Sequence, residues 1–123
     1  MKALIIDDSR TIRQLLSRIL HECGWEVVEA GHGQEALEVL AANSDCRLAL
    51  VDWNMPVMNG LEFVRSVRGE DKHTDMRIMM VTTENDTSNI ILALEAGANE
   101  YVMKPFNRDV IEKKIALLGL TAA

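Results

Sequence analysis

The stretch Leu48-Ala-Leu-Val-Asp-Trp-Asn-Met-Pro-Val-Met-Asn-Gly60 decides the fold of this chain. Its first four residues are purely apolar, which predicts a short strand buried on both faces, as in a parallel sheet. The strand must end near Asp52, because Pro56 lacks an N–H and Asn59-Gly60 is a turn pair. Asp52 therefore lies at a strand–loop–helix corner, either as an ordinary strand-end residue or as part of a site.

A helical pattern follows this corner. Leu61, Val64 and Val67 recur at three-residue steps, which is the spacing of one apolar helix face. Asn59 is a candidate N-cap, and Glu62 three residues later fits a capping box. The corner therefore predicts a strand joined to a capped helix by a short loop.

The same alternation of strand and helix continues along the chain. We predict strands over residues 3–6, 25–29, 48–51, 78–81 and 100–103. We predict helices between Ser9 and Gly24, over 34–42, from Asn59 to Gly69, over 87–96, and after Asn107. Such alternation predicts right-handed βαβ units and a parallel sheet, with two helices on one face and three on the other. Residues 25–29 suit an edge strand, and periodicity leaves the strand order open.

Composition limits the classes of function. A chain of 123 residues with 48% hydrophobic and 26% charged residues predicts one globular domain. Its net charge of −6 argues against nucleic acid as a direct partner, since phosphate neutralisation needs a basic face. No apolar run reaches the roughly 20 residues that cross a bilayer, and the first residues lack a signal-peptide pattern. We expect a cytoplasmic protein that does not contact membranes.

Two further expectations concern a cysteine and a loop. Cys23 lies on the apolar stripe of the first helix, which predicts a buried free thiol, and its spacing from Cys46 is not that of a metal site. The polar residues 70–75 predict a surface loop.

Reactive side chains follow four of the five predicted strands. Asp7 and Asp8 follow the first strand, Asp52 the third, Thr82 the fourth and Lys104 the fifth. The carboxyl ends of parallel strands share one edge of the sheet, so these side chains converge. Three crowded carboxylates repel, which raises the pKa of at least one of them or attracts a cation, and hard oxygen ligands suit Mg²⁺.

A lysine beside such a cluster suits an oxyanion such as a phosphoryl group. The residues therefore predict phosphoryl transfer, with Asp52 either as nucleophile or as metal ligand only. Each residue alone has a plainer interpretation: Asp7-Asp8 as a helix start, Thr82 as a strand end, Lys104 as a surface charge. Their joint occurrence at four strand ends favours a site.

These residues resemble the receiver domain of bacterial response regulators, through Asp7-Asp8, Asp52, Thr82 and Lys104-Pro105. The resemblance covers the whole chain and implies a single receiver domain over residues 1–123, with no output domain. Within the family the chain is most similar to the stand-alone chemotaxis regulators, on the residues Asp52-Trp-Asn-Met-Pro56, Glu84, Tyr101 and Lys104-Pro-Phe106. It implies a flavodoxin-like α/β fold in three layers, a doubly wound five-stranded parallel sheet of order 2-1-3-4-5 with five helices.

The resemblance also implies a phosphoacceptor and a metal site. Asp52 would accept a phosphoryl group from the phosphohistidine of a histidine kinase or phosphotransfer domain. Asp8, Asp52 and the backbone carbonyl of Asn54 would hold Mg²⁺, with Asp7 acting mostly through water. Mn²⁺ is an expected substitute for Mg²⁺.

Further roles come with the same resemblance. Lys104 and the Thr82 hydroxyl would contact phosphoryl oxygens, and a cis Lys104-Pro105 bond would aim the lysine inward. Tyr101 would be the switch residue that turns inward as Thr82 moves. Asn54 and Glu84 would tune dephosphorylation by admitting the attacking water.

The predicted fourth helix is too apolar for all its residues to face inward. Ile90, Ile91, Leu92 and Leu94 follow each other closely. They are either scattered surface residues or a partner face. The resemblance favours a face on helix four, strand five and helix five, in which Ile90, Ile91, Tyr101 and Lys114 contact a downstream protein. We expect a monomer.

The resulting hypothesis is a phosphorylation-activated switch of a two-component system that is not an enzyme, beyond promoting its own phosphorylation and dephosphorylation. Chemotaxis or flagellar motor control is one candidate pathway, and a single-domain phosphorelay intermediate is another. A haloacid-dehalogenase-type phosphohydrolase is the enzymatic alternative, but its nucleophile belongs in an Asp-x-Asp motif after the first strand. A flavodoxin-like cofactor binder would need a glycine- and hydroxyl-rich phosphate loop where Asp7-Asp8 stands.

Overall fold

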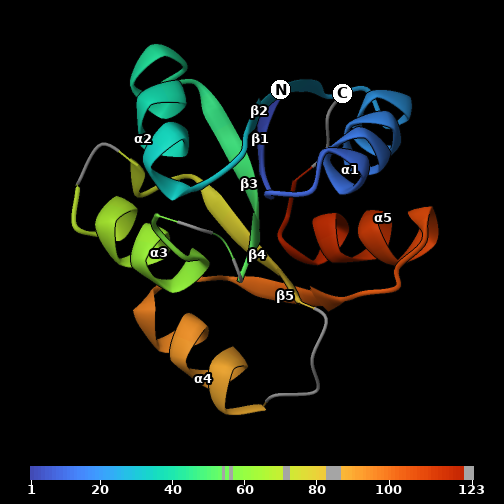
Figure 1. Cartoon of the computed structure of the whole chain (residues 1–123). Coiled ribbons are helices and arrows are strands. Elements are labelled where there is room, and N and C mark those ends of the chain that lie inside the picture. The colour runs from blue at the N-terminus through green and yellow to red at the C-terminus, as the bar shows by residue number, and fades with distance from the viewer. Residues whose placement is uncertain (54, 56, 71–72, 83–86, 121–123) are drawn as a thin grey trace.

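The computed structural model describes residues 1–53, 55, 57–70, 73–82 and 87–120 (Figure 1). Its sheet is parallel and five-stranded, in the order β2-β1-β3-β4-β5. The strands are β1 (Lys2–Ile6), β2 (Glu26–Ala30), β3 (Cys46–Asp52), β4 (Arg77–Thr82) and β5 (Glu100–Met103). The helices are α1 (Arg10–Glu22), α2 (Gly33–Ala42), α3 (Gly60–Arg68), α4 (Thr87–Ala96) and α5 (Arg108–Leu117). The predicted order and the edge position of β2 are confirmed.

The helices cover both faces of the sheet, as Figure 1 shows, with α2, α3 and α4 on one side and α1 and α5 on the other. Two apolar clusters fill the two interfaces. Val51 and Phe63 belong to the cluster beneath α2, α3 and α4, whereas Leu50 and Leu16 belong to the cluster beneath α1 and α5. Successive strand residues point to opposite faces, so one apolar strand supplies both clusters. The predicted three-layer architecture is confirmed.

The central strand β3 is the most buried of the five. Leu48, Ala49, Leu50 and Val51 have no exposed surface, and β1 and β4 pair with the strand on its two sides. The strand is longer than predicted, because Cys46 and Arg47 extend it at its start and Asp52 is its last residue. Burial on both faces therefore holds Asp52 on a rigid element.

Side-chain caps determine where the helices begin. The Ser9 hydroxyl accepts a hydrogen bond from the Ile12 N–H at 3.3 Å, and the Asn107 amide oxygen accepts one from the Val110 N–H at 3.0 Å. The carbonyl oxygen of the Asn59 side chain accepts from the Glu62 N–H at 2.9 Å, and the Glu62 carboxylate accepts from the Asn59 N–H at 3.1 Å. The three predicted caps and the capping box are confirmed.

Two details of helix burial differ from the prediction. Leu61 is only half-buried, and Phe63 is fully buried beside Val64 and Val67. A helix turns 100° per residue, so residues at strict three-residue steps drift away from the buried face. Cys23 is also only half-buried, and its thiol donates to a Glu112 carboxylate oxygen at 3.4 Å, so the prediction of a buried thiol there was wrong.

The segment before β4 is not the fully exposed loop that its polarity predicted. His73 is buried, with 7% of its surface exposed. The guanidinium group of Arg68 draws the chain inward, donating to the carbonyl oxygens of His73 at 2.9 Å, Met76 at 2.7 Å and Gly97 at 2.9 Å. This one side chain therefore ties the end of α3 to the start of β4 and to the end of α4.

Candidate functional site

The carboxyl ends of four strands bring the predicted site residues to one edge of the sheet. In the strand register, Ile6 pairs with Val51 and Asp52 pairs with Val81. Asp7 follows β1 directly, and Lys104 follows β5, with its backbone N–H donating to the Thr82 carbonyl oxygen at 2.7 Å. The fold thus assembles residues that lie up to about a hundred positions apart in sequence.

Three carboxylates form the centre of this edge. Asp7, Asp8 and Asp52 each place one carboxylate oxygen within 4.8 Å of the others. Asp7 and Asp52 are buried, with 1% and 7% of their surface exposed, whereas Asp8 is exposed. The cluster is therefore closed on the side of the sheet and open to solvent at Asp8. Oxygen ligands with an open side suit a hard cation that keeps several waters, so the predicted residues fit a metal site.

Lys104 lies against the two buried carboxylates. Its ammonium nitrogen is 3.2 Å from an Asp7 carboxylate oxygen and 3.4 Å from an Asp52 carboxylate oxygen, and its side chain is 16% exposed. The Lys104-Pro105 peptide bond is cis, as predicted. The ammonium group thus balances part of the negative charge at this edge.

The electrostatics of the edge act most strongly on Asp52. Burial raises the pKa of its carboxyl group to about 6, and the charges of Asp7 and, more weakly, Asp8 also raise it, while Lys104 opposes the rise. One carboxyl pKa is raised, as expected, but burial is the larger cause and the crowding of carboxylates adds to it. An ionised Asp52 is poorly solvated in this position, so a cation or an electrophilic group that takes up its charge is stabilised there.

Comparison with known proteins decides the family. The profile of the response regulator receiver domain matches residues 3–116. The chain belongs to this family. Its curated relatives include the chemotaxis protein CheY homolog of Campylobacter jejuni, 47% identical over 94% of this chain and 89% of the relative. They also include the chemotaxis protein CheY1 of Helicobacter pylori, 44% identical over 96% of both chains.

A solved structure agrees with the sequence relatives. The chemotaxis protein CheY4 of Vibrio cholerae is 36% identical and covers 95% of this chain and 97% of its own, with a TM-score of 0.89. This receiver domain is thus homologous to CheY, a phosphorylation-activated signalling switch in chemotaxis, and the dehalogenase-type alternative is not favoured.

The remaining predicted residues of the receiver domain lie around this centre. Thr82 ends β4, one position beyond Val81, the register partner of Asp52. Tyr101 is half-buried on β5, and the Lys114 ammonium group lies 4.8 Å from the centroid of its ring. Lys114 also pairs with a Glu100 carboxylate oxygen at 3.0 Å. Asn54 and Glu84, predicted to act in metal binding and dephosphorylation, lie outside the described residues.

The outward side of α4 carries apolar surface, as its sequence predicted. Ala93 is buried and Ile90 half-buried, whereas Ile91, Leu92 and Leu94 are 49%, 40% and 41% exposed. In Figure 1, α4 lies on one side of the edge strand β5 and α5 on the other, and the partner face predicted across these three elements stays a prediction.

Sequence reasoning missed one residue of the site. Arg13, one turn into α1, donates from a guanidinium nitrogen to the carbonyl oxygen of Asp7. In the sequence, Arg13 is marked only as a basic residue one helical turn beyond the Ser9 cap. In the structure it lies on the side of α1 that faces β2. Such a signal does not identify a backbone carbonyl as the acceptor, because that contact depends on how α1 packs.

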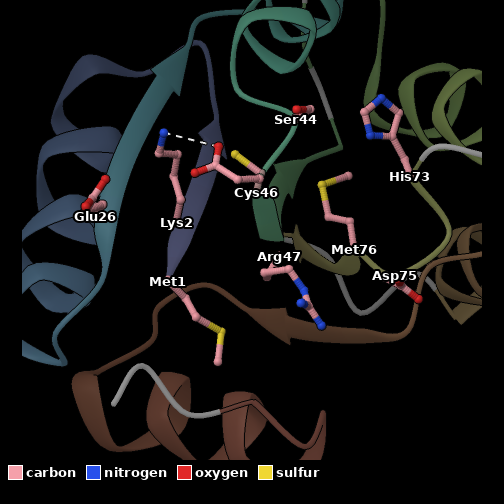
Figure 2. Close-up of a pocket in the computed structure, with 10 residues that line it drawn as sticks. Met1, Lys2, Glu26, Ser44, Cys46, Arg47, His73, Asp75 and Met76 are labelled. Carbon is pink, nitrogen blue, oxygen red and sulfur yellow. Dashed lines mark ion pairs between the residues drawn. The ribbon is translucent and has the colours of Figure 1, made fainter.

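A hollow of about 480 Å³ lies at the opposite edge of the sheet, near the starts of β1, β2 and β3 (Figure 2). The Lys2 ammonium group pairs there with an Asp45 carboxylate oxygen at 3.2 Å, and Cys46 lines its wall. Burial raises the pKa of the Cys46 thiol to about 11, which leaves it protonated and unreactive. This hollow is separate from the carboxylate edge. No helix in the described part of the chain is long and apolar enough to cross a membrane.

Proposed function

We propose that this receiver domain is a chemotaxis-type switch that takes a phosphoryl group onto Asp52 from a histidine kinase or phosphotransfer domain. The observation that carries the proposal is the environment of Asp52. Its carboxyl is buried at the end of the central strand, has a pKa raised to about 6, and lies 3.4 Å from the Lys104 ammonium group. Such a carboxylate is a positioned nucleophile beside a cation that can receive an oxyanion.

The chemistry follows from the residues at the edge. A carboxylate oxygen of Asp52 forms the new bond to phosphorus while the bond from phosphorus to the donor imidazole nitrogen breaks, and the electron pair leaves with the imidazole. Lys104, now held by Asp7 and Asp52, exchanges these contacts for a phosphoryl oxygen, and the Thr82 hydroxyl donates to another. Asp8, Asp52 and the carbonyl of Asn54 would hold Mg²⁺, with Asp7 acting through water and Mn²⁺ as a substitute. When bound, the metal would neutralise negative charge that develops at this edge.

The same proposal includes the output of the switch. Movement of Thr82 toward the phosphoryl group would leave space into which Tyr101 turns. This rotation would change the face formed by Ile90, Ile91, Tyr101 and Lys114, to which a downstream protein binds. The Lys114–Tyr101 contact at 4.8 Å supports this link, because a rotation of the ring necessarily alters the position of the lysine relative to it. We propose that residues 1–123 act as one such domain, as a monomer in the cytoplasm, and that the only reactions they promote are phosphorylation and dephosphorylation of Asp52.

The decisive experiment is phosphorylation by acetyl phosphate. With Mg²⁺ present, the wild-type protein should gain the mass of one phosphoryl group, and Asp52→Asn should gain none. Intact-mass spectrometry measures both. Asp45→Asn is a matched control, because Asp45 is an exposed aspartate at the opposite edge of the sheet. Labelling of Asp52→Asn at the wild-type level would remove Asp52 from the role of acceptor.

A second prediction concerns the lifetime of the phosphoprotein. Asn54 and Glu84 are polar, and by resemblance to the family we expect them to admit the attacking water, so the phosphoryl group should be lost quickly. Replacement of either by a bulkier or positively charged residue should slow this loss. The measurement is decay of the phosphorylated mass after removal of acetyl phosphate. A wild-type phosphoprotein that persists for hours would contradict the prediction.

A further inference from the structure

Arg13 connects three elements beside the acidic edge. One of its guanidinium nitrogens donates to the carbonyl oxygen of Asp7, the residue that follows β1. Its Nε donates to a Glu29 carboxylate oxygen on β2 at 3.2 Å. The Arg13 side chain is 20% exposed: its contact with the Asp7 carbonyl oxygen is partly buried, whereas its contact with Glu29, which is 41% exposed, is open to water. A planar guanidinium with two partners in different directions holds its position more firmly than a single-point contact does.

The contact with Arg13 completes the restraint of Asp7. Its N–H donates to the Ala30 carbonyl oxygen at 3.1 Å, and one carboxylate oxygen accepts from the Ser9 N–H at 2.8 Å. Its other carboxylate oxygen accepts from Lys104 at 3.2 Å. Arg13 takes the one remaining polar group of Asp7, the carbonyl oxygen of the Asp7–Asp8 peptide. The orientation of this peptide plane, together with the φ angle of Asp8, sets the direction in which the exposed Asp8 side chain leaves the backbone.

We propose that Arg13 is a positioning residue for the metal site, which holds the Asp7–Asp8 peptide and so aims the Asp8 carboxylate at the cation. The inference rests on the proposed Mg²⁺-dependent phosphorylation and adds a residue to it. Groups that orient metal ligands from behind typically change metal affinity by about 10- to 100-fold when they are replaced.

The sign of the effect separates this role from simple electrostatics. Arg13 carries a positive charge, and removing a positive charge near three carboxylates favours binding of a dication. If Arg13 acted only through its charge, it would weaken Mg²⁺ binding, and its replacement would raise the affinity for Mg²⁺. If Arg13 positions Asp8, its replacement should lower the affinity for Mg²⁺, because the loss of a fixed Asp8 orientation outweighs the change in charge.

The test compares Mg²⁺ affinity in the wild type, Arg13→Gln, Arg13→Lys and Arg10→Gln. Titration with MgCl₂ at a temperature below the melting transition is followed by Trp53 fluorescence. Thermal melts at each MgCl₂ concentration then give the shift in melting temperature. Arg13→Gln should raise the dissociation constant about tenfold. Arg13→Lys should raise it severalfold, since an ammonium group cannot hold both partners in fixed directions. Arg10→Gln is the matched control: it removes the same charge from the exposed first residue of α1 and should leave the constant unchanged or slightly lower.

The outcomes distinguish the two levels of the proposal. A wild type without Mg²⁺-dependent change in fluorescence or stability would refute the metal site itself. A wild type that binds Mg²⁺, with Arg13→Gln binding equally or more tightly, would refute only the role of Arg13. An Arg13 that merely braces the fold would lower the metal-free melting temperature without moving the dissociation constant of the folded protein. If Arg13→Gln does not fold, Arg13→Lys decides: an unchanged constant in that variant overturns the inference.

Discussion

Asp52 is placed where its charge is unfavourable for the folded chain. Burial and the neighbouring Asp7 raise its pKa to about 6 from an ordinary value of 3.8, and Lys104 only partly offsets them. Because one pKa unit corresponds to about 1.4 kcal/mol, the ionised side chain destabilises the native state by roughly 3 kcal/mol. The native state binds the proton more tightly than the unfolded chain does, so this destabilisation grows as the pH rises from about 4 to about 6 and is complete above that range.

We therefore predict that Asp52→Asn stabilises the metal-free protein at pH 7 to 8 by roughly 1 to 3 kcal/mol, the lower part of the range allowing for the lost contact with Lys104. The gain should shrink as the pH falls through about 6 and vanish near pH 4. Urea unfolding of both proteins in EDTA across this range measures the difference, in which other titrating groups cancel. A gain that is independent of pH between these limits would show that the ionisation of Asp52 is not its cause.

At the scale of elements, the loop between β3 and α3 is held by close contacts at its end and contains one residue in an unfavourable backbone conformation. A Cβ at Gly60 would overlap the carbonyl oxygen of Asp52, so only glycine lets α3 begin this close to the strand. Met58 packs on Gly33 of α2, whose N–H donates to the Met58 carbonyl oxygen at 3.3 Å. Directly before Met58, Val57 adopts a φ of 68° and is 79% exposed. A β-branched residue is disfavoured in this left-handed region.

Val57→Asn should stabilise the protein by about 1 kcal/mol, because asparagine tolerates the left-handed conformation and the exposed valine contributes little packing. Thermal unfolding measures the change. Val57→Thr keeps the β-branch and the approximate size, so it should show no gain. A loss of stability in Val57→Asn would mean that the valine side chain makes contacts that outweigh its backbone strain.

At the scale of the whole molecule, the metal site is linked to global stability. Asp8 is exposed, and its charge is one of those that raise the pKa of Asp52, so its removal relieves repulsion without opening the core. A cation that binds only the native state stabilises it by about 2.7 kcal/mol at a hundred times its dissociation constant. The carboxylate cluster should thus destabilise the metal-free fold and stabilise the loaded one.

Asp8→Ala should raise the melting temperature in EDTA, and the stabilisation by Mg²⁺ should be nearly absent. The same variant should lose Mg²⁺-dependent phosphorylation by acetyl phosphate. Thermal melts of both proteins, with EDTA and with Mg²⁺, make the comparison. If the variant melts below the wild type in EDTA, or keeps the full Mg²⁺ shift, then Asp8 serves the fold and is not a metal ligand.

The sequence by itself determined the elements and the placement of the reactive residues. The apolar run at Leu48–Val51, the caps Ser9, Asn59 and Asn107, and the side chains after each strand are local signals. They follow from short-range rules of burial, capping and turn formation, and the structure agrees with them. Parallel strands also made it possible to predict that Asp7, Asp52 and Lys104 meet, since their ends share one edge.

Only the tertiary structure decided which groups touch at that edge. The pairing of Lys104 with both buried carboxylates, the raised pKa of Asp52 and the contact of Arg13 with the Asp7 carbonyl oxygen depend on strand register and on the packing of α1. The half-burial of Cys23 likewise depends on how α5 lies against α1. Contacts between segments far apart in sequence follow from the rotation and translation of packed elements, which no local pattern of residues encodes.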